Sequence, residues 1–451
     1  RAWSLVAQGI DQAAREQLTR SFALAEQFPN SIEAPEREVE RRASISPVLH
    51  MAGHTPELSP QAAGSVGEEE PGPDLLKQRQ GLAARGGQAG QSMRIIQNVD
   101  WRLPTIPLST YARYVIGGDI DRSHLTLALA DLKEKTIEVE SSHLFDMDDG
   151  PDICLKRVVD DLQTLLASRG VAWEQVIGIG LATPGPLDDS LRKILSVSQN
   201  AAQKTRPISQ MPGWEGLDIP DALEHKLKLK KKVPIYLGKD TNMGALGESR
   251  YGHERGTPIL VYVKVEMGIG AGIVIGDQLY CGTGAAGELG HVIVVKERGK
   301  ICACGNRGCL ETVAATPAIV KASMRTALHV PYGPAPGAFV LAKPGEKRKI
   351  AEVIQAARHG DAASQIALKR AGTYIGIAIG GVINFFSPSM ILLDGEVVHS
   401  DFLFDALMHT AKESSLHVSW RAARIKLRTF DWPVVVGAID NAIHRISNSS
   451  P

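Results

Sequence analysis

Three cysteines and a histidine lie close together in residues 291–309, at a spacing that suits a metal ion. His291 is followed eleven residues later by the segment CACGNRGCLE, which spans residues 302–311. Thiolate and imidazole groups are the ligands that tetrahedral zinc prefers, and the two glycines of the segment let the backbone turn the sulfur atoms inward. We therefore predict a closed structural zinc site whose ligands are His291, Cys302, Cys304 and Cys309.

The alternative for this cluster is that the thiols are buried as small apolar groups, as free cysteines often are. Three cysteines and a histidine at loop spacing seldom arise from packing alone, so we favour the metal site. Only two further cysteines, Cys154 and Cys281, occur in the 451 residues. We therefore expect no disulfide framework, and we expect a reducing compartment.

Two carboxylates flank the predicted metal site. Glu288 lies three residues before His291 in the string GELGH, and Glu311 lies two residues after Cys309. A metal ion that orders this loop also positions both carboxylates. Because carboxylates accept hydrogen bonds from hydroxyl groups, they suit a polyol ligand.

The strings GAAGELGH and CACGNRGCLE closely resemble the signature of the ROK family, which contains bacterial sugar kinases such as glucokinase and sugar-responsive transcriptional repressors. The resemblance extends from about Arg113 to Arg445. It implies an α/β protein with the two-domain actin-like ATPase (ribonuclease-H-like) fold, with the sugar deep in the cleft between the domains and the nucleotide near its mouth. It also implies a homo-oligomer.

The resemblance further implies which residues contact the sugar. A strand of the family kinases ends in Glu-Asn-Asp-Ala-Asn, and the matching residues here are 238–242, Gly-Lys-Asp-Thr-Asn. Asp240 therefore takes the position of the catalytic general base, although a helix N-cap is an equally good interpretation. Lys239 replaces the Asn, and its ammonium donates hydrogen bonds but accepts none. The implied sugar contacts are Gly185, Lys239, Asp240, Glu288, His291 and Glu311.

The phosphate-binding motifs of the family kinases are altered in this sequence. Residues 119–123 are Asp-Ile-Asp-Arg-Ser where those kinases have approximately Asp-Ile-Gly-Gly-Thr, whose small residues let backbone N–H groups approach the phosphates. Residues 266–270 are Glu-Met-Gly-Ile-Gly in place of Gly-Thr-Gly-Ile-Gly, and the glycine pair near the adenosine becomes Asp-Gly-Glu at 394–396. This degenerate nucleotide site comprises Asp119, Asp121, Arg122, Ser123, Glu266, Gly268, Gly270 and Gly395.

Three functional hypotheses are consistent with these departures. An added carboxylate costs about 1–4 kcal/mol when it lies about 4 Å from a phosphate charge. Pairing of Arg122 with Asp121 would instead leave a neutral plug. The losses resemble the repressor branch of the family, so our first hypothesis is a sugar-binding, transcriptional-regulator-like sensor. The alternative is an ATP- and Mg²⁺-dependent hexose kinase with Asp240 as base, and a zinc-stabilised scaffold is a weaker third.

Composition and length set the domain organisation. The chain has 50 basic and 50 acidic residues, so its net charge gives no argument for nucleic acid as a partner. No run of eighteen apolar residues occurs, so we expect a cytoplasmic protein without membrane contact. The sequence begins with Arg1, and we expect a fragment or a processed form. We divide it into an extension (1–110), a smaller α/β domain (111–240 with a C-terminal helix at 434–447) and a larger α/β domain with the zinc loop (241–433).

Alternating apolar strands and amphipathic helices begin at Tyr114 and predict mostly parallel sheets with helices on their faces. A polar turn at 121–123 joins the first two strands, Pro151 opens a helix that continues to residue 169, and a hairpin-like pair surrounds 266–270. Further helices are expected at about 316–328, 350–358, 361–386 and 400–414.

Residues 1–110 have a different character. Segment 52–91 is rich in Gly, Pro, Ala and Gln, which is typical of disorder, and only residues 4–27 have a loose helical period. We expect residues up to about 105 not to pack onto the fold. The pattern of a winged helix-turn-helix is not found there, so a small-molecule sugar is the expected partner and DNA binding has no support from the sequence.

Overall fold

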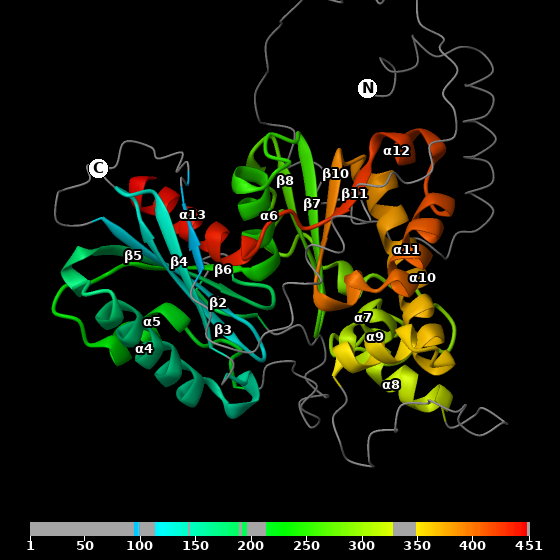
Figure 1. Cartoon of the computed structure of the whole chain (residues 1–451), viewed down its shortest axis with the longest axis horizontal. Coiled ribbons are helices and arrows are strands. Elements are labelled where there is room, and N and C mark those ends of the chain that lie inside the picture. Colours follow the sequence, from blue (N-terminus) through cyan, green and yellow to red (C-terminus); the bar gives the residue numbers. More distant parts are fainter. Residues whose placement is uncertain are drawn as a thin grey trace, which may run out of the picture. The chain divides into compact units, whose positions relative to one another are not determined.

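The computed structural model describes residues 94–97, 99, 113–142, 145–188, 192–195, 213–327 and 349–448, all within the compact unit Glu70–Pro451. The predictions for residues 4–27 and 52–91 lie outside the described residues, as does most of the segment searched for a DNA-binding motif. Two β-sheets organise the described part of the chain (Figure 1).

The first sheet has six strands in the order β1-β4-β3-β2-β5-β6. The β2–β3 hairpin is antiparallel and places Asp119 opposite Thr126, and β5 and β6 follow β2 in parallel. Because β2, β5 and β6 are parallel, their carboxyl ends lie at one edge of the sheet. The strands are β1 (Arg94–Ile96), β2 (Tyr114–Ile120), β3 (Leu125–Asp131), β4 (Thr136–Ser142), β5 (Val176–Thr183) and β6 (Ile235–Lys239).

Strand β1 corrects one sequence-based expectation. Residues 94–96 were expected to belong to an unpacked extension, but β1 pairs antiparallel with β4, and Val99 is buried. A strand of three residues is too short to show a recognisable alternation, which explains why the sequence does not reveal it.

Helices cover both faces of the six-stranded sheet (Figure 1). Helices α4 (Pro151–Ser168) and α5 (Ile219–Leu227) pack on one face, and Pro151 stands in the first turn as predicted. The C-terminal helix α13 (Pro433–Asn448) packs on the other face through Val435, Ile439 and Ile443. This sheet therefore has a buried core on each side.

The second sheet has five strands in the order β11-β10-β7-β8-β9. Its strands are β7 (Ile259–Val265), β8 (Ile269–Ile275), β9 (Gln278–Leu279), β10 (Met390–Asp394) and β11 (Arg424–Leu427). One face carries a large apolar core with the helices α7 (Glu311–Ala314), α8 (Thr316–Ala327), α9 (Ile350–Arg358), α10 (Ala362–Phe386) and α11 (Asp401–Glu413). Helix α12 (His417–Ala422) precedes β11.

Both sheets are mixed, so the prediction of mostly parallel sheets is wrong for the described residues. The pairs β2–β3, β3–β4, β1–β4, β7–β8 and β8–β9 are antiparallel. Tight turns join most of these strands, and a short turn can only produce an antiparallel pair. The crossover helices produce the parallel pairs β2–β5, β5–β6, β7–β10 and β10–β11.

Helix α6 (Asp240–Tyr251) packs against α13 and connects the two halves of the fold. The two backbones approach so closely that a Cβ on Gly437 would lie 1.9 Å from the carbonyl oxygen of Met243. Ala245 of α6 also belongs to a core cluster with the second sheet. Because β6 leads directly into α6, the carboxyl edge of the first sheet faces the second sheet.

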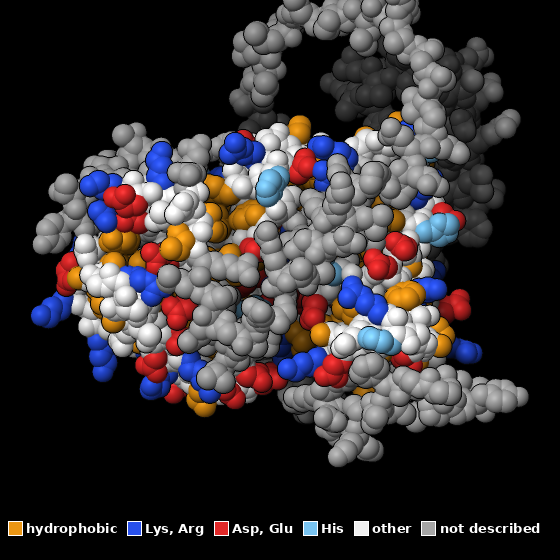
Figure 2. Space-filling view, in the orientation of Figure 1, with side chains coloured by type: hydrophobic (Ala, Val, Ile, Leu, Met, Phe, Trp, Pro, Cys, Tyr) orange, Lys and Arg blue, Asp and Glu red, His pale blue; other side chains and the backbone are white. Residues whose placement is uncertain are grey.

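Two surface properties bear on possible partners. Acidic and basic side chains are interspersed on the face shown in Figure 2, in keeping with the balanced charge of the chain. Among the described residues, α10 alone is long and apolar enough to span a bilayer, and 56% of its most apolar window is buried inside the protein. A core helix passes the same test, so α10 gives weak evidence for a membrane span.

Candidate functional site

One cleft gathers side chains from both sheets. It contains all six residues implied as sugar contacts and five of the eight residues of the degenerate nucleotide site. Its lining includes Asp121, Arg122, Gly185, Lys239, Asp240, Lys264, Glu266, Gly268, Gly270, Glu288, His291 and Glu311. Asp119 lies just behind the lining at the end of β2, Ser123 is exposed in the β2–β3 turn, and Gly395 precedes the 3₁₀-helix Glu396–His399.

Asp240 stands where β6 ends and α6 begins. Its Oδ1 accepts a hydrogen bond from the backbone N–H of Thr241 at 2.7 Å, and its Oδ2 lies 3.2 Å from the ammonium of Lys264. The helix starts at Asp240 itself, with Lys239 at the N-cap position, so the interpretation of Asp240 as the N-cap is wrong. Its carboxylate lines the cleft instead.

Lys239 and Glu288 form an ion pair inside the cleft. The Lys239 ammonium donates to Oε1 of Glu288 at 2.6 Å, and the Lys239 side chain is only 6% exposed. The sequence identified Lys239 as a donor but could not indicate its partner, because 49 residues separate the two. The pair presents a donor beside an acceptor, which suits the hydroxyl groups of a polyol.

The four predicted metal ligands come together in one cluster. The ligand atoms of His291, Cys302, Cys304 and Cys309 lie within 4.8 Å of one another, and the three cysteines are buried. Sγ of Cys304 lies 3.7 Å from Sγ of Cys309, and Sγ of Cys302 lies 3.5 Å from Nδ1 of His291. A tetrahedral zinc ion with its usual bond lengths would give separations of about 3.8 Å and about 3.5 Å. The cluster therefore fits a tetrahedral metal ion.

A sharply turned loop carries the cysteines. Gly308 has φ of 79°, and a Cβ at this position would lie 1.8 Å from the carbonyl oxygen of Val295. Only glycine tolerates both conditions. The predicted need for glycine in this loop is thus physically explained at Gly308.

The metal cluster borders the cleft through His291 and Glu311. Nδ1 of His291 faces Cys302, while its Nε2 lies 3.9 Å from Oε2 of Glu288. Glu311 begins α7, and its Oε1 accepts a hydrogen bond from the Cys302 thiol at 2.8 Å. Residues that could hold a metal ion and residues that line the cleft are therefore in direct contact.

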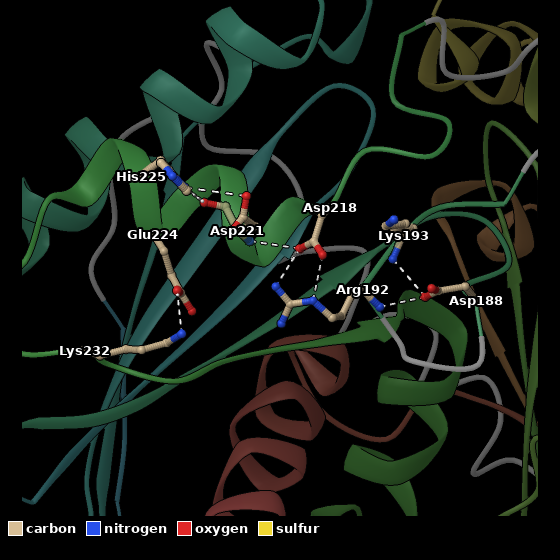
Figure 3. A network of polar contacts seen from close by, with 8 residues as sticks. All are labelled: Asp188, Arg192, Lys193, Asp218, Asp221, Glu224, His225 and Lys232. Carbon is tan, nitrogen blue, oxygen red and sulfur yellow. Dashed lines mark hydrogen bonds and ion pairs between the residues drawn. The ribbon is translucent and has the colours of Figure 1, made fainter.

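A polar network fastens the loop that carries Gly185 (Figure 3). Nε and Nη2 of Arg192 donate to the two carboxylate oxygens of Asp218 at 2.7 Å each, which joins the loop to the N-terminus of α5. The backbone N–H groups of Arg192 and Lys193 donate to Oδ1 of Asp188 at 2.8 and 2.9 Å. These bonds hold the backbone beside Gly185 at the wall of the cleft.

A buried lysine that sequence reasoning missed lies at the centre of the altered nucleotide motifs. The ammonium of Lys264, in β7, lies 2.7 Å from Oδ2 of Asp121, 3.2 Å from Asp240 and 3.4 Å from Glu266. Its side chain is 8% exposed. A lysine within the apolar strand ILVYVKV was the available signal, since a buried ammonium requires charged partners. Lys264 thus neutralises part of the charge that the two added carboxylates introduce.

The ionisation of this group follows from burial and from the neighbouring charges. Burial acts to lower the pKa of Lys264, but Asp121, Glu266 and Asp240 raise it well above its usual value. Burial acts to raise the pKa of Asp121, and Lys264 with other partners brings it below its usual value. Burial together with the other carboxylates raises the pKa of Glu266 well above the ordinary range. Lys264 is therefore a permanent cation, and Asp121 is its permanent counter-ion.

Arg122 does not form the neutral plug that the sequence suggested. Its guanidinium pairs with Asp148 at 2.9 Å, and Lys264 is the partner of Asp121. Asp394, in the third altered motif, accepts from Nε of Arg428 at 2.8 Å and from the hydroxyl of Tyr262. Lys264 of β7 and Arg428, which follows β11, thus pair with carboxylates of all three altered motifs.

Comparison with known proteins agrees with this geometry. A sequence model of the ROK family matches residues 115–434. The chain is 27% identical over 290 residues to a xylose repressor of Bacillus spizizenii, covering 64% of this chain and 66% of the repressor. It is 29% identical over 253 residues to a glucokinase of Halalkalibacterium halodurans, covering 55% of this chain and 70% of that enzyme. A crystal structure of a ROK family transcriptional regulator, a homologue of the Escherichia coli MLC protein, superposes with a TM-score of 0.57 at 26% identity, covering 74% of this chain and 81% of the regulator.

The chain has the actin-like ATPase fold, with two α/β halves around a cleft. The chain belongs to the ROK family. It spans just under two thirds of the length of the xylose repressor that it matches.

Proposed function

We propose that this chain is a sugar-binding sensor of the repressor branch of the ROK family and that it does not transfer a phosphoryl group. The observation that carries the proposal is Lys264, which pairs with Asp121, Asp240 and Glu266 in the same cleft that holds the acceptor residues. The chain thus keeps the proposed sugar-binding residues of the family, while the residues that bind phosphate in the family kinases have been replaced.

Sugar binding is supported by the convergence of acceptors. Asp240, Glu288 and Glu311 line one cleft and have lone pairs for hydroxyl donors, while Lys239 supplies a donor. Such a set suits the ring hydroxyls of an aldose, each of which both donates and accepts. The names of the similar xylose and N-acetylglucosamine repressors support a sugar ligand of this kind.

The charged groups around Asp240 disfavour phosphoryl transfer. A general base must accept a proton from the attacking hydroxyl, but Oδ2 of Asp240 already accepts a hydrogen bond from the Lys264 ammonium at 3.2 Å. Asp121 adds negative charge where the family resemblance places phosphates, and Glu266 replaces a glycine of the second phosphate motif. The alternative hypothesis of a hexose kinase that uses Mg²⁺ and ATP is therefore not favoured.

We further propose that the metal cluster holds a structural zinc ion. Three sulfur ligands and one imidazole leave no open coordination position, so the ion would order the loop rather than act on a substrate. Because His291 and Glu311 also line the cleft, an ordered loop would fix the positions of these two side chains in the cleft. Zinc binding and sugar binding should therefore depend on each other.

The remaining parts of the proposal concern organisation. We propose a smaller domain of residues 111–240 with the C-terminal helix, and a larger domain of residues 241–433, in a cytoplasmic protein. We also propose self-association, which the exposed apolar side chains of Phe385 (83% exposed) and Ile293 (54% exposed) support. The described residues give no argument for or against DNA binding.

A thermal-shift panel tests the proposed function. Bound ligand raises the midpoint of unfolding by mass action, so the cognate aldose should raise it while ATP with Mg²⁺ should not. A coupled phosphorylation assay on the same protein should give no turnover. Stabilisation by ATP with sugar-dependent turnover would contradict the proposal.

A further inference from the structure

A second group of possible metal ligands lies at the β2–β3 turn, apart from the cysteine cluster. Asp119, Asp121 and His124 each offer one ligand atom, and these atoms lie within 4.8 Å of one another. Asp119 and Asp121 are buried, and His124 is half-buried. The hairpin itself sets this arrangement, because the backbone N–H of Asp121 donates to the carbonyl oxygen of His124 at 3.0 Å.

Asp119 supplies an independent indication of a missing partner. The residue is 7% exposed, and its Oδ1 accepts no hydrogen bond from any residue that the structure describes. A buried carboxylate oxygen without a donor costs about 1–3 kcal/mol or more, so such atoms usually face a bound ion, a water molecule or a proton. Asp119, which carries this atom, belongs to the same group as Asp121 and His124.

The balance of charge also favours an added cation. Four carboxylates, Asp119, Asp121, Asp240 and Glu266, act on the single ammonium of Lys264. The group thus has more negative charge than Lys264 neutralises, and a proton or a cation must supply the difference.

We propose that Asp119, Asp121 and His124 bind a divalent first-row transition-metal ion without any nucleotide. Two carboxylates and one imidazole form a mixed oxygen and nitrogen set, which suits Mn²⁺, Fe²⁺ or Zn²⁺ better than the soft metals that thiolates select. The same excess of negative charge that repels phosphate attracts this ion. The altered motif would therefore bind a cation at the position where the family kinases bind phosphate.

Lys264 sets the affinity of this site. Its ammonium lies 2.7 Å from Oδ2 of Asp121 and competes with a metal ion for that carboxylate. Replacement of Lys264 by a neutral side chain should therefore increase metal affinity. An increase in metal affinity would distinguish a metal site from a purely structural cluster, in which loss of Lys264 would only destabilise the fold.

The test is a titration of the zinc-loaded protein with Mn²⁺ in the absence of nucleotide, followed by the loss of the electron paramagnetic resonance signal of free Mn²⁺. The wild type should bind one Mn²⁺ per chain. Asp121→Asn and His124→Ala should each lower the affinity about tenfold or more. Asp148→Asn, an exposed carboxylate of the same neighbourhood that pairs with Arg122, should leave it unchanged.

Lys264→Met provides the second measurement. The proposal expects tighter Mn²⁺ binding than in the wild type, together with a rise in the unfolding midpoint on adding Mn²⁺ that exceeds the wild-type rise. His124→Ala covers the case in which Asp121→Asn fails to fold, because His124 is only half-buried. Equal Mn²⁺ binding by the wild type and His124→Ala, or no Mn²⁺ binding at millimolar concentration, would overturn the proposal.

Discussion

The ammonium of Lys264 and the carboxylate of Asp121 lie 2.7 Å apart although they belong to different β-sheets. Asp121 follows β2 of the six-stranded sheet, and Lys264 lies in β7 of the five-stranded sheet. Asp240, also at the edge of the first sheet, is a further partner. Lys264 is therefore an ionic link across the cleft as well as the compensating charge of the altered nucleotide motifs.

Loss of this link should destabilise the protein strongly. Lys264→Met leaves buried carboxylates without their cation, which costs about 3–5 kcal/mol of unfolding free energy. Urea unfolding in metal-free buffer measures the change. Lys156→Met is the control, because Lys156 pairs with Asp160 on an exposed helix surface and such pairs contribute about 0.5 kcal/mol or less. Equal stability of both variants would contradict the role of Lys264.

Removal of one thiol should release the metal. Cys304→Ser loses a soft ligand of the proposed zinc site, so zinc content by elemental analysis should fall from about one per chain toward zero. Cys154→Ser should retain the metal, because Cys154 is buried in the core of the six-stranded sheet. Absence of stoichiometric metal in the wild type would contradict the assignment.

Glu311 should be required for sugar binding. Glu311→Gln replaces a charged acceptor at the cleft wall, and loss of a hydrogen bond to a charged group costs about 1.5–3 kcal/mol, or roughly a tenfold to hundredfold weaker affinity. The sugar-dependent thermal shift should therefore shrink or disappear. Glu297→Gln, an exposed carboxylate of the neighbouring loop, should behave as the wild type. A shift unaffected by Glu311→Gln would remove this residue from the site.

Stability should depend on pH through Glu248. This residue is fully buried in α6, and both of its carboxylate oxygens accept from Thr429. Burial raises the pKa of Glu248 from 4.5 to about 7. The folded state then binds more protons than the unfolded state between these values, so this group lowers stability as pH rises from about 4.5 to about 7, by about 3 kcal/mol in total.

Glu248→Gln isolates this contribution. The amide keeps an acceptor for the Thr429 N–H and cannot ionise, so the variant should gain stability relative to the wild type at pH 8 but not at pH 4. Denaturant unfolding at both pH values gives the comparison. A stability difference between variant and wild type that does not change with pH would show that Glu248 does not titrate as described.

Some of these features could be predicted from the sequence, and others could not. The β2–β3 hairpin, the start of α4 at Pro151 and the cysteine cluster depend on local patterns, so short segments indicate them. The short strand β1 and the mixed pairing of the sheets depend on partners elsewhere in the chain. Local propensity carries little information about such pairings.

The residues of the candidate site also divide into those that the sequence indicated and those that it did not. Motif resemblance indicated Asp240, Glu288 and Glu311, and the structure brings them to one cleft. The sequence did not indicate the role of Lys264, because that role depends on carboxylates from other parts of the chain. One of them, Asp121, is 143 residues away in the sequence. Ion pairs between distant residues require the fold before they can be recognised.

Parallel measurement of sugar binding and sugar phosphorylation tests the central claim most directly. Calorimetric titration with a panel of aldoses should reveal binding, while a coupled assay with ATP, Mg²⁺ and the same sugar should show negligible turnover at high protein concentration. A turnover near about 1 per second, in the ordinary range for enzymes, that disappears in Asp240→Asn would contradict the sensor and establish a kinase. Sugar binding without turnover, weakened by Glu311→Gln, is the result that the account predicts.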